Sequence, residues 1–315
     1  MADVDDRGQL LLVGALTLAV MLVALAVLLN AAIYTGNVAT RDAGTGAGEA
    51  IEYENEATTM AQASIDGVDG DTYAAVRSNF TDSVTGWSEL AHTHSGASLT
   101  STNLTTVDMT NGSRIAQQTD RNFTDDNGNS TWTVAEDSHV RAFRLNVTQG
   151  DLASSATDAF QVTFNDGTDE WGVFVHSDGS GNVAVTVEDE TDTEVGDGCT
   201  VDPGADDRVV VDITAGTVAG EDCPELRFFG NLSGTYTVGY VDALDGSDNE
   251  QVNGTYSLVV DEPTSSLVTG ADEDAGAPTV SPALYSADLN VTYRSADLFY
   301  QSEFRVAPGE AGADD

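Results

Sequence analysis

A run of twenty residues at positions 10–29, apolar except for Thr17, limits what this chain can fold into more than any other feature. Twenty helical residues rise about 30 Å, which matches the hydrocarbon thickness of a bilayer. No charged residue occurs between positions 8 and 40. Since a helix in a soluble core seldom lacks a polar face over such a length, the run predicts a membrane-spanning helix.

A cleaved secretory signal peptide is the main alternative for this run. Such signals have an apolar core of about 7–15 residues, followed by a cleavage site of small residues. Here the run is longer, and the segment after it, Asn-Ala-Ala-Ile-Tyr, contains no clear Ala-x-Ala site. We therefore expect a retained anchor that crosses a cell membrane once and contacts membrane lipid.

The whole chain is extremely acidic, with 53 Asp and Glu against 11 basic residues, all of them arginine, and a formal net charge of −42. In dilute buffer this charge opposes folding by self-repulsion. In molar salt the Debye length falls to about 3 Å and the repulsion is screened. The composition resembles that of haloarchaeal proteins, so we expect a halophilic protein with a solvated acidic surface. The same charge argues against a nucleic-acid partner.

Two cysteines, Cys199 and Cys223, lie 24 positions apart. Their spacing fits no zinc pattern, which needs four clustered ligands. Outside a cell such a pair indicates a disulfide, which for a loop of this length would stabilise the fold by about 3 kcal/mol.

Asn-x-Ser/Thr sequons are the second sign of an extracellular location. Such sites need exposed acceptors outside the cell, although a Thr-rich β protein also forms some of them incidentally. All nine follow the apolar run, so with the cysteines they predict that residues 41–315 are extracellular. The sequons stand at Asn79, Asn103, Asn111, Asn122, Asn129, Asn146, Asn231, Asn253 and Asn290.

The first part of the chain is expected to be helical. After a leader (residues 1–8) and a transmembrane or filament-core helix (residues 9–40), apolar residues recur at three- and four-residue steps to about residue 90. This spacing predicts a helical stalk over residues 41–94, with a second amphipathic helix in its later part. Residues 95–130 are rich in Ser, Thr, Asn, Asp and Gly and are expected to form a polar linker.

From residue 131 the apolar period changes to two, with Gly- and Asp-rich turns between short segments. This pattern predicts a β-rich extracellular domain over residues 131–306, resembling an antiparallel β-sandwich. A disordered polar tail is expected over residues 307–315. The expected fold class is therefore α+β.

No residue pattern indicates catalysis. His92 and His94 do not share a helix face, and no hydrolase, zinc-protease or phosphate-loop motif occurs. Acidic turns at residues 125–129 and 242–248 are similar to calcium loops but lack the EF-hand order. Trp132 and Trp171 could bind sugars, but alternating strands favour core positions for them. We expect no enzyme, no cofactor and no metal site.

The tripeptide Arg7-Gly8-Gln9 before the apolar run resembles the class III signal sequences of archaeal type IV pilins and archaellins. The segments Arg-Gly-Gln-Leu-Leu-Leu-Val-Gly-Ala and Leu-Asn-Ala-Ala-Ile-Tyr-Thr are similar to a group of haloarchaeal pilin-like envelope proteins, as are two short segments near the C-terminus. The resemblance implies cleavage between Gly8 and Gln9. It also implies that the apolar helix packs with other pilin-like subunits. Many pilins carry glutamate at the fifth mature position, where this chain has Val13.

Two functions follow as expectations. The first is a pilin-like cell-surface protein that forms a minor subunit of a type IV pilus-like structure. The second is a singly anchored cell-surface glycoprotein that binds surface glycans or a protein partner through its β domain. Cleavage at the Gly8–Gln9 bond distinguishes them.

Overall fold

The computed structural model describes residues 47–310 except 97–98, 190, 192, 205–206, 245–250 and 272–277. The apolar run and the junction of Gly8 with Gln9 lie outside the described residues. Of the helices that are described, none is long and apolar enough to cross a membrane. The chain divides into two compact units. Unit 1 contains the residues up to Ala57, Leu90–Asn103 and Val291–Ser302, and unit 2 contains the rest.

Two helices occur where the apolar spacing predicts them: one over residues 47–67 and α2 (Tyr73–Gly96). Thr72 begins α2, since its Oγ1 accepts a hydrogen bond from the backbone N–H of Ala75 at 3.2 Å. Each helix buries one face, as the three- and four-residue spacing requires. The buried residues are Ala50, Tyr53, Ala57, Ala61 and Ile65 in the first helix and Val76, Phe80, Val84 and Ser88 in α2.

The strands form two sheets. Within each sheet, every pair of neighbouring strands for which a register is resolved runs antiparallel. The eight-stranded sheet has the order β10 (Glu221–Asp222), β9 (Thr217–Val218), β8 (Arg208–Asp212), β3 (Val140–Thr148), β12 (Asn253–Val260), β1 (Ser101–Asn122), β13 (Thr279–Arg294) and β14 (Phe299–Val306). The six-stranded sheet has the order β2 (Trp132–Ser138), β11 (Tyr236–Val241), β4 (Phe160–Asn165), β5 (Glu170–Ser177), β6 (Val183–Glu188) and β7 (Cys199–Val201). Three 3₁₀ segments join strands: η1 (Gln149–Asp151), η2 (Ala156–Asp158) and η3 (Pro224–Asn231).

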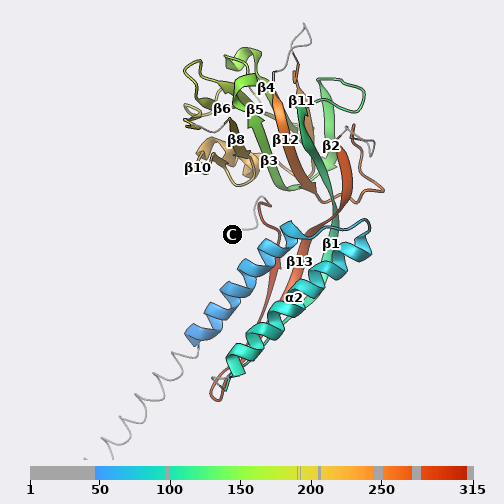
Figure 1. Ribbon diagram of the computed structural model, residues 1–315, viewed down its shortest axis with the longest axis vertical. Coiled ribbons are helices and arrows are strands. Elements are labelled where there is room, and N and C mark those ends of the chain that lie inside the picture. The colour runs from blue at the N-terminus through green and yellow to red at the C-terminus, as the bar shows by residue number, and fades with distance from the viewer. Residues whose placement is uncertain are drawn as a thin grey trace, which may run out of the picture. The chain divides into compact units, whose positions relative to one another are not determined.

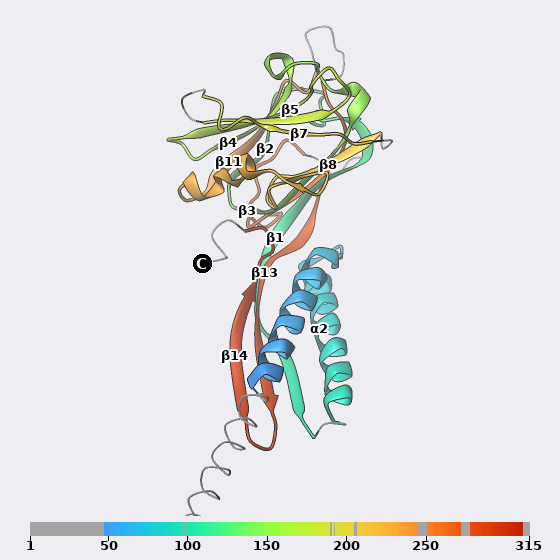
Figure 2. The same cartoon turned by 90° about the vertical axis from the view of Figure 1, so that its left-hand side faces the viewer.

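In unit 2 the two sheets stack face to face, with β4 and β5 lying over β3 and β8 (Figure 2). The core between them is rich in aromatic rings around the fully buried Tyr240, whose ring centroid lies 5.0 Å from that of Phe160 and 5.5 Å from that of Trp132. Trp171 is also buried, in a stack on Phe228. Unit 2 is therefore a β-sandwich-like domain, as the period of two predicts.

Unit 1 contains the first part of the helix over residues 47–67 and the hairpin that joins β13 to β14. The ring centroids of Tyr53 and Tyr293 are 6.5 Å apart, and Tyr293 Oη donates a hydrogen bond to Glu49 at 2.7 Å. Tyr300 Oη donates to Glu54. These contacts hold the helix against the hairpin within this unit.

The expected polar linker over residues 95–130 is wrong for residues 101–122, which form the 22-residue strand β1. The sequence of β1 does not show alternating apolar residues, because several buried positions carry polar side chains, including Thr102, Ser113 and Gln117. The expected disordered tail is wrong for its described part: Ala307 is buried, and Glu310 forms an ion pair with Arg305. Residues 311–315 lie outside the described residues.

Candidate functional site

The outer face of the eight-stranded sheet carries a hollow of about 550 Å³ in unit 2. The neighbouring strands β3, β12 and β8 are seen in Figure 1. Phe143, Leu145 and Ile115 point into the core, so the alternating residues on β3 and β1 point outward. We call this feature the sheet hollow. Its outward lining comprises Arg114, Ala116, Gln118, Ala142, Arg144, Asn146, Val210, Thr255, Ser257 and Val259, with Asp66 at its side.

Strand register places small side chains in the middle of the sheet hollow. Ser257 of β12 lies opposite Ala116 of β1 on one side and Arg144 of β3 on the other. Val259 lies opposite Arg114 and Ala142 in the same way. The two arginines therefore flank a floor of short side chains. Because the arginine side chains are much longer than those of the floor, the surface between them is hollowed.

The guanidinium group of Arg144 is held in place through its Nε–H group, which is hydrogen-bonded to Asp212. Its Nε donates a hydrogen bond to Asp212 Oδ2 at 2.5 Å, and this bond is the main reason that the pKa of Arg144 is raised. The side chain is 63% exposed, and its two Nη groups make no hydrogen bond or ion pair among the described residues. Arg144 therefore presents a positioned pair of N–H donors at the edge of the hollow.

Arg114 is tied to the end of the first helix. Its Nη1 lies 2.8 Å from Asp69 Oδ1, and its Nη2 donates to the backbone carbonyl of Asp66 at 2.8 Å. Its side chain is only one-fifth exposed. Arg114 thus fixes the helix end beside the hollow, and its charge is balanced by that of Asp69.

Asp66 also pairs with Arg141, the largest fully buried side chain described. Arg141 Nη1 lies 2.5 Å from Asp66 Oδ1, and Nη2 donates to the carbonyl of Leu284 at 3.4 Å. Burial lowers the pKa of Arg141, and the Asp66 charge and hydrogen bond raise it again in part. The carboxylate of Asp66 is therefore committed to Arg141 and adds little free negative charge to the hollow.

A second hollow of about 660 Å³ shares Asp66, Ala142 and Arg144 with the first. It is lined by three acidic residues against two arginines, one of which is Arg227. Arg227 is paired with Asp222 and is 61% exposed. Because acids outnumber cations there, this second hollow offers less to an anion.

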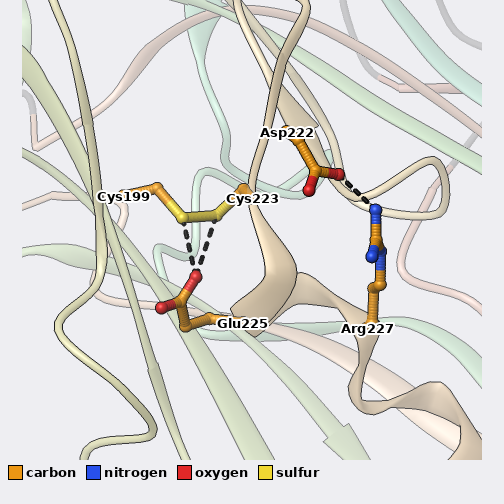
Figure 3. The surroundings of a disulfide bond; sticks show 5 residues. All are labelled: Cys199, Asp222, Cys223, Glu225 and Arg227. Carbon is orange, nitrogen blue, oxygen red and sulfur yellow. Dashed lines mark hydrogen bonds and ion pairs between the residues drawn. A yellow bond between two sulfur atoms is a disulfide. The ribbon is translucent and has the colours of Figure 1, made fainter.

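Cys199 of β7 and Cys223, just before η3, form a disulfide with a Cα–Cα distance of 5.7 Å. The carboxylate of Glu225 points at the bond (Figure 3), with Oε2 3.0 Å from Cys199 Sγ and 3.9 Å from Cys223 Sγ. Two sulfurs and a carboxylate at this spacing could hold a metal ion only as thiolates. As a disulfide the pair offers no thiolate ligand.

The nine sequon asparagines differ in exposure. Asn79, Asn103, Asn129 and Asn231 are exposed, and Asn111, Asn122, Asn146, Asn253 and Asn290 are partly buried. The Oδ1 atoms of Asn146 and Asn253 are buried and have no hydrogen-bond partner among the described residues. Exposure alone therefore favours only some of these sites for modification.

His92 and the acidic turn at residues 125–129 have structural roles, and residues 245–248 of the other acidic turn lie outside the described residues. His92 Nδ1 lies 3.2 Å from the carbonyl of Thr102. In the acidic turn at residues 125–129, Asp125 Oδ1 accepts hydrogen bonds from the backbone N–H groups of Asn127 and Asn129. Burial would raise the pKa of Asp125, but side-chain and backbone hydrogen bonds from Asn129 and Asn127 together outweigh it and lower the pKa. The turn is therefore closed on itself.

The sheet hollow was not found from sequence because its residues come from four strands that are distant along the chain. Arg144 does stand in the region after residue 131 where apolar residues alternate, and a cation there is unusual in so acidic a chain. That single signal could have pointed to β3. The neighbours of β3 across the sheet could not be predicted from it.

A family model described as a family of unknown function (DUF7261) matches residues 4–163, just over half of the chain. No curated protein matches the chain, and no solved structure does. The matched segment includes the Gly8–Gln9 junction, the apolar run, both described helices and β1 to β3. Strands β8 and β12 and both cysteines lie beyond it.

Proposed function

The chain belongs to DUF7261, a family of unknown function, and we propose that it is a pilin-like cell-surface protein, a minor subunit of a type IV pilus-like structure in a halophilic archaeon. The tripeptide Arg7-Gly8-Gln9 directly before the apolar run carries this proposal. The family match covers this junction, the apolar run and both helices, but the family itself has no known function.

In this proposal a peptidase cleaves between Gly8 and Gln9. The apolar helix then lies in lipid or packs with the helices of other pilin-like subunits, and the β-sandwich domain faces the outside. The absence of an acid at Val13 leaves the new N-terminal amine without the usual carboxylate partner in a neighbouring subunit. The apolar helices would then associate through van der Waals packing, without this ion pair between subunits.

Exposed apolar side chains in unit 1 support an assembly role. Seven large apolar side chains are exposed in the described residues, and four of them belong to the small unit 1: Ile51, Leu90, Leu99 and Phe299. Exposed apolar side chains that lie together on a surface are typical of sites that contact a partner or a membrane. A contact with another subunit would remove these side chains from water.

A second function, a singly anchored glycoprotein that binds surface glycan or a protein, is favoured by the sheet hollow. It needs no filament. The two functions share the same extracellular placement of unit 2 and differ in what happens at the N-terminus.

Mass spectrometry of the N-terminal peptide of the native protein tests the first function. We expect the mature chain to begin at Gln9, or at its cyclised form, and the protein to be enriched in sheared filaments. A Gly8→Val change at the junction should block processing, whereas Gly14→Val within the apolar run should not. An intact leader in a protein that is absent from filaments would overturn the proposal.

A further inference from the structure

Positive charge is scarce in this molecule, yet two arginines share one hollow. The chain has 11 basic against 53 acidic residues. Arg114 and Arg144 line the sheet hollow together with a single acid, Asp66, which is already paired with the buried Arg141. Arg114 is paired with Asp69 and Arg144 with Asp212, so the charges around the hollow are balanced on an otherwise strongly anionic protein. What the hollow offers an anion is the pair of Nη donors of Arg144, which Asp212 leaves unused.

Arg144 has the geometry to bind a carboxylate. Asp212 occupies its Nε and fixes the plane of the guanidinium group, while both Nη groups remain available. Paired N–H donors in this plane match the two oxygens of a carboxylate, and such bidentate bonds are stronger than neutral ones.

The rest of the sheet hollow suits a flat ring with hydroxyl groups. Its floor is made of the short side chains of Ala116, Ala142 and Ser257. Its rim adds the side chains of Gln118, Asn146 and Thr255, whose amide and hydroxyl groups donate and accept hydrogen bonds. The volume of about 550 Å³ lies within the range of about 300–1,000 Å³ typical of small-ligand sites.

A peptide fits this surface less well. Extended peptides commonly bind by adding a strand to a free sheet edge. Here β3 lies between β8 and β12, and β12 lies between β3 and β1, so the backbone groups under the hollow are already paired. Recognition must come from side chains above the sheet, which favours a saccharide.

We propose that the sheet hollow binds an acidic saccharide of the hexuronic acid class. The sugar ring lies over Ala116, Ala142 and Ser257, and its carboxylate accepts two hydrogen bonds from Arg144. The inference rests on the extracellular placement of unit 2 in the proposed function. It does not require cleavage at Gly8 or assembly into filaments.

Calorimetric titration of the full chain in detergent and molar KCl with tetragalacturonate tests this inference. We expect saturable one-to-one binding, and about tenfold weaker binding for Arg144→Gln, which removes a charge-assisted bidentate contact. Arg144→Lys should be weakened as well, because it keeps the charge and loses the paired donors. Ser257→Phe, which fills the floor, should abolish binding, and circular dichroism would verify that this variant is folded.

Arg227→Gln is the matched control, since Arg227 is also paired with an aspartate and equally exposed but lies outside the sheet hollow. Its affinity should stay within twofold of the wild type. The inference is overturned by absent binding, by equal loss in Arg227→Gln, by equally tight binding of neutral maltotetraose, or by equally tight binding of hexaglutamate. None of these outcomes bears on the N-terminal processing, which is tested separately.

Discussion

Asp66 Oδ1 lies 2.5 Å from Nη1 of Arg141, whose side chain is completely buried while that of Asp66 is 38% exposed. Asp66 stands at the end of the first helix and Arg141 on β3, so this pair joins helix and sheet within unit 2. Burying a guanidinium group is costly unless a partner compensates its charge. The pair is therefore expected to be needed for folding.

Asp66→Ala should lower the free energy of unfolding by about 3 kcal/mol, the low end of the range for breaking a buried ion pair, because water reaches part of the site. Asp69→Ala is the matched control. Asp69 pairs with Arg114, but its side chain is 83% exposed, so its loss should cost about 0–1 kcal/mol. Urea unfolding in molar KCl, followed by the fluorescence of the buried Trp132 and Trp171, measures both. Equal effects of the two substitutions would contradict the assignment.

The buried ion pair is one of the features that could not be predicted from the sequence. The buried faces of the helices and the strands after residue 131 follow from apolar periodicity, because there the pattern and the burial coincide. Strand β1 was missed because Thr102, Ser113 and Gln117 face inward although they are polar. Gln117 is accommodated because its Nε2 donates to the carbonyls of Arg121 and Gly254. Such compensation depends on neighbours from distant strands, which no local pattern reveals.

The same reason explains why Arg141 and the sheet hollow were not predicted. An arginine in an alternating segment is normally assigned to the solvent side. Arg141 is buried because Asp66, 75 positions earlier, reaches it. The hollow likewise depends on the register of β12 against β1 and β3, which is set by the whole sheet.

Glu225 should protect the disulfide from reduction. A thiol reductant attacks as its thiolate, and Cys199 is the more accessible sulfur because Cys223 is fully buried. The Glu225 carboxylate, 3.0 Å from Cys199 Sγ, repels the incoming anion by roughly 1 kcal/mol in a water-like dielectric. Glu225→Gln should therefore speed reduction by dithiothreitol about fivefold, measured by alkylation of the released thiols.

Asp222→Asn is the control for this effect. Asp222 is next to Cys223, but its carboxylate is turned toward Arg227 and away from the sulfurs (Figure 3). Its neutralisation should change the reduction rate much less than that of Glu225. A Glu225→Gln protein that is reduced no faster than the wild type would show that the carboxylate does not protect the bond.

Glycan occupancy should follow the exposure of each acceptor. Asn231 and Asn103 are exposed and should be modified, whereas the partly buried Asn146 and Asn253 should not. Mass spectrometry of peptides from the native protein gives the occupancy of each site. A glycan on Asn146 would lie in the sheet hollow, so its detection would also contradict saccharide binding there.

Acid should destabilise the protein in high salt, and Asp166 is one cause. Backbone N–H groups of Asp169, Ser233 and Thr168 donate hydrogen bonds to its carboxylate and hold its pKa well below the usual value. A lowered pKa in the folded state means that the stability is fully present above the ordinary Asp pKa of about 4 and is lost as the pH falls through the lowered value. Hydrogen bonds likewise lower the pKa values of Asp178 and Asp189.

Protonation of carboxylates also has a stabilising effect, which opposes the loss of hydrogen bonds. It relieves the repulsion that arises from a net charge of −42. In molar KCl the Debye length is about 3 Å, so this relief is small and the lost hydrogen bonds dominate. The melting temperature in 3 M KCl should therefore stay level from pH 7 to about pH 5 and fall below it. Asp166→Asn should show a smaller fall than Asp169→Asn, a neighbouring change of equal charge. A melting temperature that rises between pH 5 and pH 3 in molar KCl would show that charge repulsion outweighs these hydrogen bonds.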